Sequence, residues 1–425
     1  MINQVQPRVL VAHTGARRHY AIPVLLNESG LLDHFITDVY AGSGSWLRPI
    51  LRLLPDSIRI GSITRLNGRS ANLPANKVIA FNMLGFLALA KFHWGRLTKN
   101  LDNSFYIQYS RIFQEKVTTL LGNATAVYCF SGQGMELFKV ARQKGLICIC
   151  DQISAPINYH SIKIREEAIT WEGWQKSKDK LRDKAAWYAR EAEEWCLADA
   201  ILSPSTYVTD ALLSEGVPSQ KIATIPNAVP EDMYSGRVHY YVGTRPLRIL
   251  FVGSVNLNKG VPYLLEALKI LGPNKIQAKF VGPVEIFREK LNPFLEIAEF
   301  IGNTPRTQVA PYYDWADIFV LPSLSEGSAT VVYEAQACGL PSVVTPNTGT
   351  WIQDGVDGFL VPIRDSSALV EAFVKFIENP QLVEDMSRNA LKNAMNYSYE
   401  AYRQRLEYII ISLHNQLLNK PSFNE

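Results

Sequence analysis

Cysteine is scarce in this sequence, with five residues among 425. Two of them alternate along a strand-like run, "LICICDQI", so both side chains would face the same side of a sheet. Neither the cysteines nor any pair of acidic residues shows a metal-binding spacing, and we expect no metal ion and no cofactor. An odd number of cysteines without a disulfide pattern favours a reducing cytoplasm. The five are Cys129, Cys148, Cys150, Cys196 and Cys338.

Long hydrophobic runs are also lacking. The longest, "VIAFNMLGFLALAKFHW", is broken by Asn82 and contains Lys91, so it falls short of the roughly 20 apolar residues that a transmembrane helix needs. We expect a buried or surface-docking helix there. The first seven residues are polar, and a strand-like run, "RVLVAH", follows at once, which is not the pattern of a secretory signal. The composition, 47% hydrophobic and 20% charged, is typical of a soluble globular protein.

Net charge is uneven along the chain. Residues 1–125 hold 14 Lys and Arg against 6 Asp and Glu, whereas the rest of the chain holds 29 against 34. A basic N-terminal part attracts anions, such as the phosphate groups of lipids or substrates. Five arginines recur among apolar residues after Trp46, and this mix indicates either an interfacial helix on anionic lipid or a solvated basic face. They are Arg48, Arg52, Arg59, Arg65 and Arg69.

Two stretches of the sequence share one pattern. "RVLVAHTGARRHYAIPVLL" near the start and "RILFVGSVNLNKGVPYLLEAL" past the middle each read as a strand, a glycine-containing loop and a helix. In the second copy Pro262 suits a first helical turn. Five apolar residues follow the helical period there, and they are Val261, Leu264, Leu265, Leu268 and Leu271. A strand–loop–helix unit of this kind opens a doubly wound parallel sheet.

A chain of this length exceeds one ordinary core, which predicts two domains. Further short strands alternate with helical segments in both halves, among them "ATAVYCFSG", "ADIFVLPS" and "LPSVVTP". The sequence therefore predicts an α/β protein with two Rossmann-like domains and a cleft between them. We place an N-terminal domain at 1–235, a turn-rich linker at 236–246, a C-terminal domain at 247–395 and a last helical segment at 396–425.

The stretch "EGSATVVYEAQACGLPSVVTPN" places two acids, Glu326 and Glu334, with seven residues between them. "ADIFVLPS" reads as the preceding strand, and a helix follows that Gly339 ends. Ser328 is a plausible N-cap of that helix. The helix would begin with free N–H groups at Ala329, Thr330 and Val331, and such a start is an anion-binding site.

An anion with an acid on either side fits a sugar nucleotide, because Glu326 and Glu334 can each accept hydrogen bonds from hydroxyl groups. Lys259, the one cation in the loop "GSVNLNKG", can balance a diphosphate across the cleft. Each residue also has a plainer reading. Glu326 can favour the helix dipole, Glu334 can be solvated, and a lone lysine in a loop is more often a surface residue.

These motifs together resemble the C-terminal domain of retaining glycosyltransferases of family 4, which have the GT-B fold. The resemblance rests on the loop ending in Lys259-Gly260, on "VLPSLSEG", on "YEAQACGLPSVVT" and on "DGVDGFLVP". "LADAILSPSTYVTDALLSEGVPSQKIATIPNAV" is similar to the stretch before the family's interdomain linker. The resemblance covers about residues 190–405 well and the first 150 residues only through the opening loop.

The resemblance implies a role for each matching position. Glu326 would contact the donor sugar, Glu334 the ribose and Lys259 the diphosphate, and Lys259 and Glu326 would be the catalytic residues. The domain at 1–235 would bind the acceptor and the domain at 247–395 the nucleotide sugar. The last helix would cross back onto the N-terminal domain. The remaining donor-site positions would be the loop glycine Gly15, then Gly253, Ser254 and Ile301 of the second half, and finally Gly327, Ser328, Ala329, Thr330 and Val331.

The sequence departs from the family pattern at three places. Relatives commonly carry an arginine where this chain has Ser254, and Arg17 or Arg18 is a candidate to supply that charge from across the cleft. Relatives often have "EGFGLP" in place of "EGSATV". Many also have a histidine near the position of Asp151, and His160 is another acceptor-side candidate.

The resemblance predicts an enzyme that moves a sugar from a nucleotide diphosphate to a hydroxyl with retention, using the leaving phosphate as base and no metal. Two alternatives stay open, a sugar-nucleotide epimerase of the same fold and a non-catalytic sugar-nucleotide-binding scaffold. The expected partners are a nucleotide-sugar donor, a carbohydrate or lipid-linked acceptor and an anionic membrane surface, with no nucleic acid. We expect a cytoplasmic protein, peripheral on the inner face of the membrane, in bacterial surface polysaccharide or glycolipid synthesis. The donor sugar, its base, the acceptor and the oligomeric state are not encoded in any motif.

Overall fold

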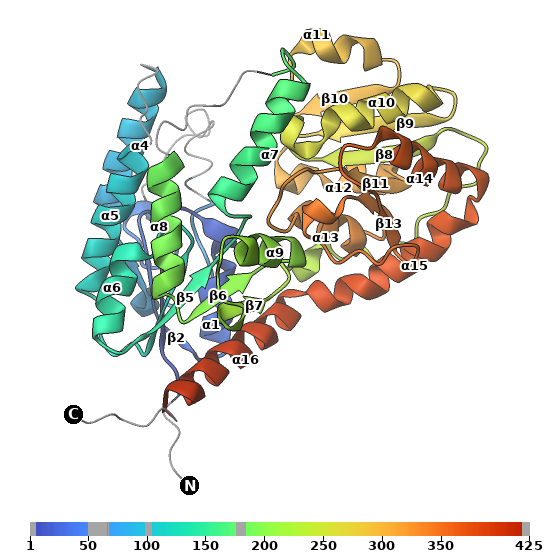
Figure 1. The fold of residues 1–425 in the computed structure, drawn as a ribbon. Coiled ribbons are helices and arrows are strands. Elements are labelled where there is room, and N and C mark those ends of the chain that lie inside the picture. The colour runs from blue at the N-terminus through green and yellow to red at the C-terminus, as the bar shows by residue number, and fades with distance from the viewer. Residues whose placement is uncertain (1–5, 50–65, 67, 98–103, 176–183, 419–425) are drawn as a thin grey trace.

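The computed structural model describes residues 6–49, 66, 68–97, 104–175 and 184–418 (Figure 1). Within them the chain forms two parallel sheets, one of seven strands and one of six, with helices packed around each. The first sheet runs from Val9 to Thr224 and the second from Leu247 to Leu360. This arrangement confirms the predicted α/β architecture of two Rossmann-like domains.

The N-terminal sheet has the strand order β3-β2-β1-β4-β5-β6-β7, so β1 lies where the order reverses. Its strands are β1 (Val9–His13), β2 (Leu32–Thr37), β3 (Val78–Ala80), β4 (Ala126–Phe130), β5 (Ile147–Asp151), β6 (Ala200–Ser203) and β7 (Ile222–Thr224). Its helices are α1 (Ala21–Glu28), α4 (Asn82–Leu97), α5 (Ser104–Thr118), α6 (Met135–Gln143), α7 (Ile157–Thr170), α8 (Lys184–Leu197) and α9 (Thr206–Ser214). Both faces of such a sheet are covered, which explains its near-continuous apolar strands.

The C-terminal sheet has the order β10-β9-β8-β11-β12-β13, with β8 at the reversal. Its strands are β8 (Leu247–Val252), β9 (Ile276–Val281), β10 (Ala298–Gly302), β11 (Ile318–Leu321), β12 (Ser342–Val344) and β13 (Gly358–Leu360). Its helices are α10 (Val261–Leu271), α11 (Arg288–Leu291), α12 (Ala310–Trp315), α13 (Thr330–Ala337), α14 (Ser366–Glu378) and α15 (Gln381–Ala394). Ligands bind proteins of this kind at the carboxyl ends of strands beside such a reversal.

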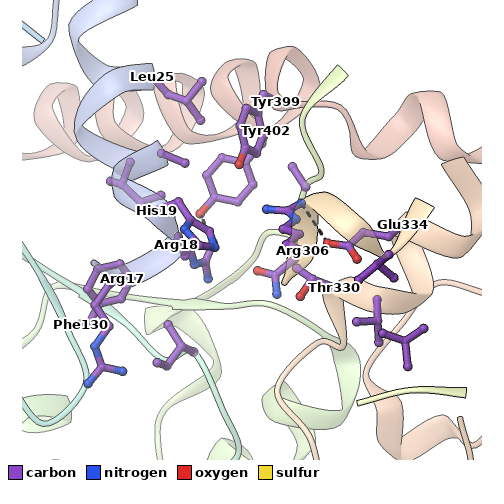
Figure 2. Close-up of a pocket in the computed structure, with 18 of the residues that line it drawn as sticks. Arg17, Arg18, His19, Leu25, Phe130, Arg306, Thr330, Glu334, Tyr399 and Tyr402 are labelled. Atoms are coloured by element: carbon purple, nitrogen blue, oxygen red, sulfur yellow. Dashed lines mark hydrogen bonds and ion pairs between the residues drawn. The ribbon is translucent and has the colours of Figure 1, made fainter. Parts of the chain in front are cut away.

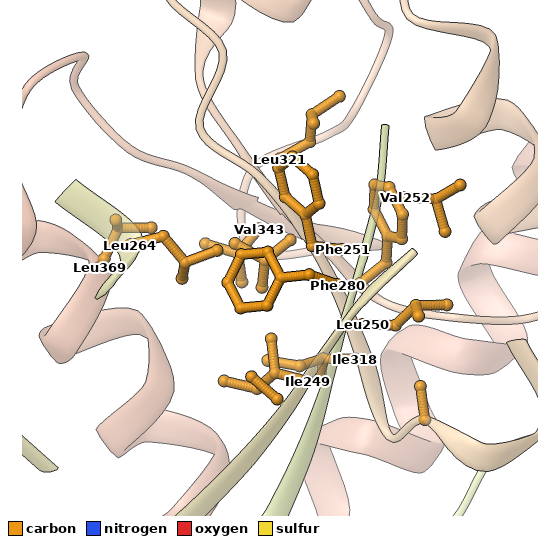
Figure 3. Packing of buried hydrophobic residues seen from close by; sticks show 14 of the residues in the cluster. Ile249, Leu250, Phe251, Val252, Leu264, Phe280, Ile318, Leu321, Val343 and Leu369 are labelled. Atoms are coloured by element: carbon orange, nitrogen blue, oxygen red, sulfur yellow. The ribbon is translucent and has the colours of Figure 1, made fainter. Parts of the chain in front are cut away.

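The core of the C-terminal domain explains why α10 forms where the sequence places it. Leu264 of α10 is fully buried and packs in one cluster with Phe251 and Phe280 from neighbouring strands (Figure 3). Pro262 lies in the first turn, where its missing N–H costs nothing. The predicted helical face is confirmed, although Leu271 at its end is only partly buried.

The last helix, α16 (Tyr399–Leu418), leaves the C-terminal domain and lies along α1 of the N-terminal domain (Figure 1). Tyr402, Leu406 and Ile410 occur at a helical spacing and are buried in the cluster that contains Val9 of β1. The prediction that the final helix crosses back is confirmed. The predicted linker, 236–246, lies between the last strand of one sheet and the first of the other, and its bounds stay a prediction.

The longest hydrophobic run is not one element. Its first residues form β3 and the rest forms α4, which begins at Asn82. None of the helices in the described ranges is both long and apolar enough to cross a membrane. Much of the basic segment between Arg48 and Arg69, at 50–65 and 67, falls outside the described residues.

Candidate active site

A cavity of about 500 Å³ lies between the two domains, a size that suits a small-molecule ligand. The ends of β4 and β8 contribute Phe130 and Val252 to it, so it lies where the carboxyl ends of both sheets meet. Figure 2 shows the side chains that converge on it from α1, α13 and α16. The polar residues of its wall include Arg17, Arg18, His19, Asn227, Thr304, Arg306, Thr330, Glu334, Tyr399 and Tyr402.

The loop after β1 enters the cavity in a strained conformation. Arg18, His19 and Tyr20 have φ values of 46°, 50° and 63°, in the left-handed region that side chains other than glycine rarely adopt. Tyr20 is fully buried against the ring of Phe35, and its hydroxyl donates to the carbonyl of Val39 at 3.2 Å. The surrounding core therefore holds a turn that the local sequence disfavours.

Arg18 is fixed by one partner in the N-terminal domain and one on α16. Its guanidinium pairs with Asp151 at 3.0 Å and donates to the Tyr402 hydroxyl of α16 at 2.8 Å. Asp151 also accepts a hydrogen bond from Tyr128 and is completely buried, and that burial raises the pKa of its carboxyl group. Asp151, an acceptor-side candidate from the sequence, therefore serves to hold Arg18 and does not line the cavity.

Arg17 differs from its neighbour. It lines the cavity, and within the described residues no carboxylate forms an ion pair with it. Burial lowers the pKa of Arg17, and the field of Asp151 offsets only part of that effect. Because Arg18 is paired with Asp151, Arg17 is the arginine of this loop with charge left for an anion.

Gly15 takes part in the loop through its backbone. Its φ of 73° favours glycine, its N–H donates to Asp38 at 2.8 Å, and its carbonyl accepts from Nδ1 of His13 at 3.0 Å. A side chain at Gly15 would meet open space. Because the N–H of Gly15 already has a partner, it is not free to bind a diphosphate. That a diphosphate approaches the Cα of Gly15 stays a prediction.

The loop after β8 brings together the two residues expected to be catalytic. Lys259 ends a short 3-10 turn, η5 (Leu257–Lys259), and its ammonium forms an ion pair with Glu326. The side chain of Asn256 accepts from the backbone N–H of Lys259 at 3.0 Å, which fixes the turn. Gly260 is required here, because a Cβ would lie 2.0 Å from the carbonyl oxygen of Pro322.

The remaining second-half donor positions are less exposed to a ligand than the sequence suggested. The N–H of Gly253 donates to Val281 at 2.9 Å and belongs to the sheet. Ser254 follows it, half-buried. Ile301, in strand β10, packs against the core of the C-terminal domain, while Thr304 and Arg306 in the loop after that strand line the cavity.

The start of α13 corrects two expectations. The N–H of Ala329 is not free, because it donates to the carbonyl of Thr348 at 2.9 Å. Ser328 is not the cap, because its hydroxyl bonds that of Tyr333 at 2.9 Å and the helix begins after Ala329. Thr330 and Val331 line the cavity from the first turn, where a helix leaves its N–H groups without an intrahelical partner. The start of α13 therefore offers an anion two N–H groups, those of Thr330 and Val331, and not the three that the sequence predicted.

Gly327 lies where the two domains touch. A Cβ on Gly327 would stand 1.9 Å from the carbonyl oxygen of Ile153 in the N-terminal domain, so only glycine permits this approach. Ser205 donates to the carbonyl of Gly327 at 2.6 Å, and Asn227 donates to that of Ser328 at 2.8 Å. Through these contacts the N-terminal domain fixes the position of the loop that carries Glu326.

Glu334 is buried and its two oxygens have different partners. Arg306 pairs with one oxygen at 2.9 Å (Figure 2). The hydroxyl of Tyr313 donates to the other oxygen at 3.1 Å. The reading of Glu334 as a solvated surface acid is therefore wrong. Sequence reasoning missed Arg306, for which no spacing signal existed, since the loop between β10 and α12 brings it to Glu334.

Of the three histidines on elements around the cavity, His13, His19 and His160, only His19 is part of its wall. His160 of α7 bonds the hydroxyl of Ser325 at 2.9 Å, directly beside Glu326. Desolvation lowers the pKa of His19, which lines the cavity. Burial lowers the pKa of His13 to about 4, so this ring stays neutral. No group of three or more His, Cys, Asp or Glu side chains placed to hold a metal ion occurs among the residues that the structure describes.

Residues 246–379 match the sequence profile of the family described as "Glycosyl transferases group 1". A Salmonella typhimurium protein whose name assigns it to colanic acid biosynthesis is 27% identical, covering 50% of this chain and 56% of its own length. A D-inositol 3-phosphate glycosyltransferase of Paenarthrobacter aurescens is 29% identical, over 40% of this chain and 47% of its own. This chain thus spans about half the length of these curated relatives.

Solved structures resemble nearly the whole chain. HepE from Anabaena, solved with UDP, has a TM-score of 0.59 at 14% identity and covers 95% of this chain and 100% of its own. Sucrose-phosphate synthase from Thermosynechococcus elongatus has a TM-score of 0.63 at 16% identity, over 97% of this chain and 100% of its own. At such identities the likeness establishes the fold alone.

Proposed function

Because this chain belongs to the glycosyl transferases group 1 family and has the GT-B fold, we propose that it is a retaining glycosyltransferase that uses a nucleotide diphosphate sugar. One observation carries the proposal. The family's two acids each pair with a cation, Glu326 with Lys259 and Glu334 with Arg306, at the boundary between the two domains. When a ligand binds, the two acids can accept hydrogen bonds from its hydroxyl groups and the two cations can pair with its phosphate groups.

The donor would lie along the start of α13. Its diphosphate would accept from the N–H groups of Thr330 and Val331 beside Arg17, all in the cavity wall, with Lys259 on the neighbouring loop after β8, outside that wall. Its ribose would lie at Glu334 and its sugar at Glu326. HepE, of the same fold, was solved with UDP, which supports uridine diphosphate sugars as the first donors to test.

The reaction needs positioning and charge stabilisation more than a protein base. The bond from the anomeric carbon to the phosphate oxygen breaks, and a bond from that carbon to the acceptor oxygen forms on the same face. The acceptor proton passes to the departing phosphate. Lys259, Arg17 and the helix N–H groups stabilise the charge that develops on the leaving group. Closure of the domains holds donor and acceptor in register.

Surface polysaccharide or glycolipid synthesis is the context that relatives support. One relative is named for colanic acid biosynthesis, and a lipopolysaccharide outer core galactosyltransferase, WaaB, shares the fold at a TM-score of 0.62, 14% identity, and coverage of 96% of this chain and 99% of its own. We place the acceptor, a carbohydrate or a lipid-linked carbohydrate, on the N-terminal side of the cavity. His160 and the Arg17 loop are the candidate acceptor-side groups.

An anionic membrane surface is the proposed docking partner, on the cytoplasmic side. Met83, Leu87 and Trp94 are exposed on α4, and the first 125 residues hold 14 basic against 6 acidic residues. Exposed apolar residues within a basic region favour anionic lipid. Flotation with vesicles that contain phosphatidylglycerol tests this. Equal binding to neutral phosphatidylcholine vesicles would contradict it.

One assay separates the proposed function from its rivals. The protein is incubated with a panel of UDP-, GDP- and ADP-sugars and a bacterial lipid and oligosaccharide extract, with Glu326→Gln as the matched control. Release of nucleotide diphosphate with a glycosylated product supports transfer. An altered sugar still on its nucleotide indicates an epimerase, and binding without turnover indicates a scaffold. A thermal-shift screen of the same panel identifies the base.

A further inference from the structure

Helix α7 and the residues after it leave the N-terminal sheet and pack on the C-terminal domain. Figure 1 shows α7 reaching from the first sheet toward the second. The rings of Trp171 and Tyr263 meet edge to face at 5.4 Å, and Trp174 packs on the same C-terminal core. The N–H of Phe287 donates to the carbonyl of Trp174 at 2.8 Å, and Gln175 forms a backbone bridge with Ile286. A segment of one domain is therefore built into the other.

A buried carboxylate anchors this segment. Glu167 of α7 is fully buried and pairs with Arg364, which lies between β13 and α14, while its second oxygen accepts from the Tyr263 hydroxyl at 3.0 Å. Arg364 also pairs with Glu166 at 2.8 Å. A buried charge is retained only where its partners are well placed. Both oxygens of Glu167 are used by groups of the opposite domain.

Arg364 holds an unfavourable backbone conformation to make these pairs. Its φ of 62° lies in the left-handed region, and within the described residues the others with such values are glycines or belong to the Arg18–Tyr20 turn. A glycine at position 364 would adopt this φ without strain. The presence of an arginine there is therefore explained by the ion pairs that its side chain makes.

The same segment supports the loop that carries Lys259. The side chain of Gln175 accepts from the backbone N–H of Leu257 at 3.0 Å, at the start of the η5 turn, and α7 packs against that turn. At the other end of α7, His160 bonds Ser325 beside Glu326. Both members of the Lys259–Glu326 ion pair are thus flanked by residues 157–175.

We propose that residues 157–175 are a positioning arm, fixed to the C-terminal domain by Glu167, that holds the Lys259 loop in place. The arm acts on Lys259 through the backbone of Leu257, and its anchoring residues Glu167 and Gln175 contact protein groups and not the substrate. Its role in turnover rests on the proposed transferase function, whereas its effect on the loop does not. The N-terminal domain, on the acceptor side, would thus help to position Lys259, the cation on the donor side.

The direct test is hydrogen–deuterium exchange of the peptide spanning 253–260 in the ligand-free protein. In Glu167→Gln, exchange of this peptide should rise about tenfold, because opening of the loop becomes easier. The matched control is Glu384→Gln, which breaks an exposed pair with Arg388 on α15 and should leave the peptide unchanged. A folded Glu167→Gln protein with wild-type exchange at 253–260 would overturn the proposal.

Two further variants decide the case if Glu167→Gln does not fold. Arg364→Gly removes both ion pairs while relieving backbone strain, so faster loop exchange in it cannot be ascribed to new strain. Gln175→Ala removes only the acceptor of the Leu257 N–H and should loosen the loop peptide alone. Wild-type exchange of the 253–260 peptide in both variants would refute the proposal that residues 157–175 hold the Lys259 loop.

Kinetics then separate this inference from the proposed function. With a donor identified, kcat should fall about tenfold in Glu167→Gln, with a smaller change in donor KM, because a misplaced Lys259 affects the leaving group most. A wild-type protein without any transfer refutes the proposed function, while the exchange result still decides the arm. A normal kcat together with fast loop exchange would show that the arm holds the loop but has no role in turnover.

Discussion

The loops after β1 and β8 occupy equivalent places in their sheets, each at the reversal of strand order, yet they are built differently. The first bends through three left-handed residues, Arg18 to Tyr20, that are held by buried aromatic rings and by the Arg18–Asp151 pair. The second bends through Gly260 and an asparagine cap and carries Lys259. The first loop therefore depends on the core around it, whereas the second depends on local chemistry and on the arm.

The largest effect should come from the second loop. Lys259→Ala is expected to lower donor turnover by about 100-fold to 1000-fold, because it removes a charge from the leaving diphosphate. Glu326→Gln should have an effect of similar size. Steady-state release of nucleotide diphosphate measures both.

The control for this prediction is Lys269→Ala, an exposed lysine at the far end of α10. It should keep wild-type turnover. Turnover by Lys259→Ala within threefold of wild type would remove the lysine from the mechanism.

The two neighbouring arginines of the first loop should separate function from stability. Arg17→Ala is expected to lower turnover about 10-fold to 100-fold with little change in unfolding, because its charge faces the cavity. Arg18→Ala should destabilise the protein by about 3–5 kcal/mol, because it leaves Asp151 buried without its cation.

Chemical denaturation and turnover of both variants test this contrast. If Arg17→Ala unfolds early while Arg18→Ala stays stable, the roles assigned to the two arginines are reversed.

A smaller effect is expected at the second acid. Glu334→Gln should raise donor KM about tenfold while kcat changes less, because a ribose contact contributes to binding in both ground and transition states. Arg306→Ala should also raise KM, since it leaves Glu334 buried with only Tyr313 as partner. Equal loss of kcat in Glu334→Gln and Glu326→Gln would contradict the separate roles of the two acids.

The smallest effect concerns pH and the first loop. Nδ1 of His13 donates to Gly15, while Nε2 is buried without a partner among the described residues, so protonation there is unfavourable and its pKa is about 4. The unfolded chain takes up this proton below its ordinary pKa of 6.5, before the folded protein does. Stability is therefore complete above pH 6.5 and falls as the pH drops toward 4, by about 2 kcal/mol at pH 5.

His13→Asn is the matched variant, because its amide keeps a donor for Gly15 but does not titrate. Thermal unfolding at pH 7.5 and pH 5 should show a larger loss for the wild type than for this variant. Identical losses would show that His13 is not the group responsible.

Local patterns were enough to predict the two sheets, the α10 helix and the place of the acids. The apolar period from Val261 to Leu271 fixes which face of α10 is buried, and strand runs such as "ADIFVLPS" are too apolar to lie elsewhere. The sequence did not predict that Lys259 lies close to Glu326, which follows from their positions after the neighbouring parallel strands β8 and β11.

Contacts made by distant segments could not be predicted in this way. The partner of the Ala329 N–H is Thr348, and that of Glu334 is Arg306, and neither pair shows a spacing along the chain. The same holds for Asp151. Its position at the end of a strand made it a candidate site residue, but it forms an ion pair with Arg18 from another loop. Such pairings depend on how loops pack, which a periodic pattern does not encode.

The most direct test of the whole account is a crystal structure of the protein with UDP. We expect the diphosphate against the first turn of α13, within hydrogen-bonding distance of the N–H groups of Thr330 and Val331, with Arg17 beside it, Lys259 on the neighbouring loop and the ribose at Glu334. UDP bound elsewhere, with this cavity empty, would contradict the account.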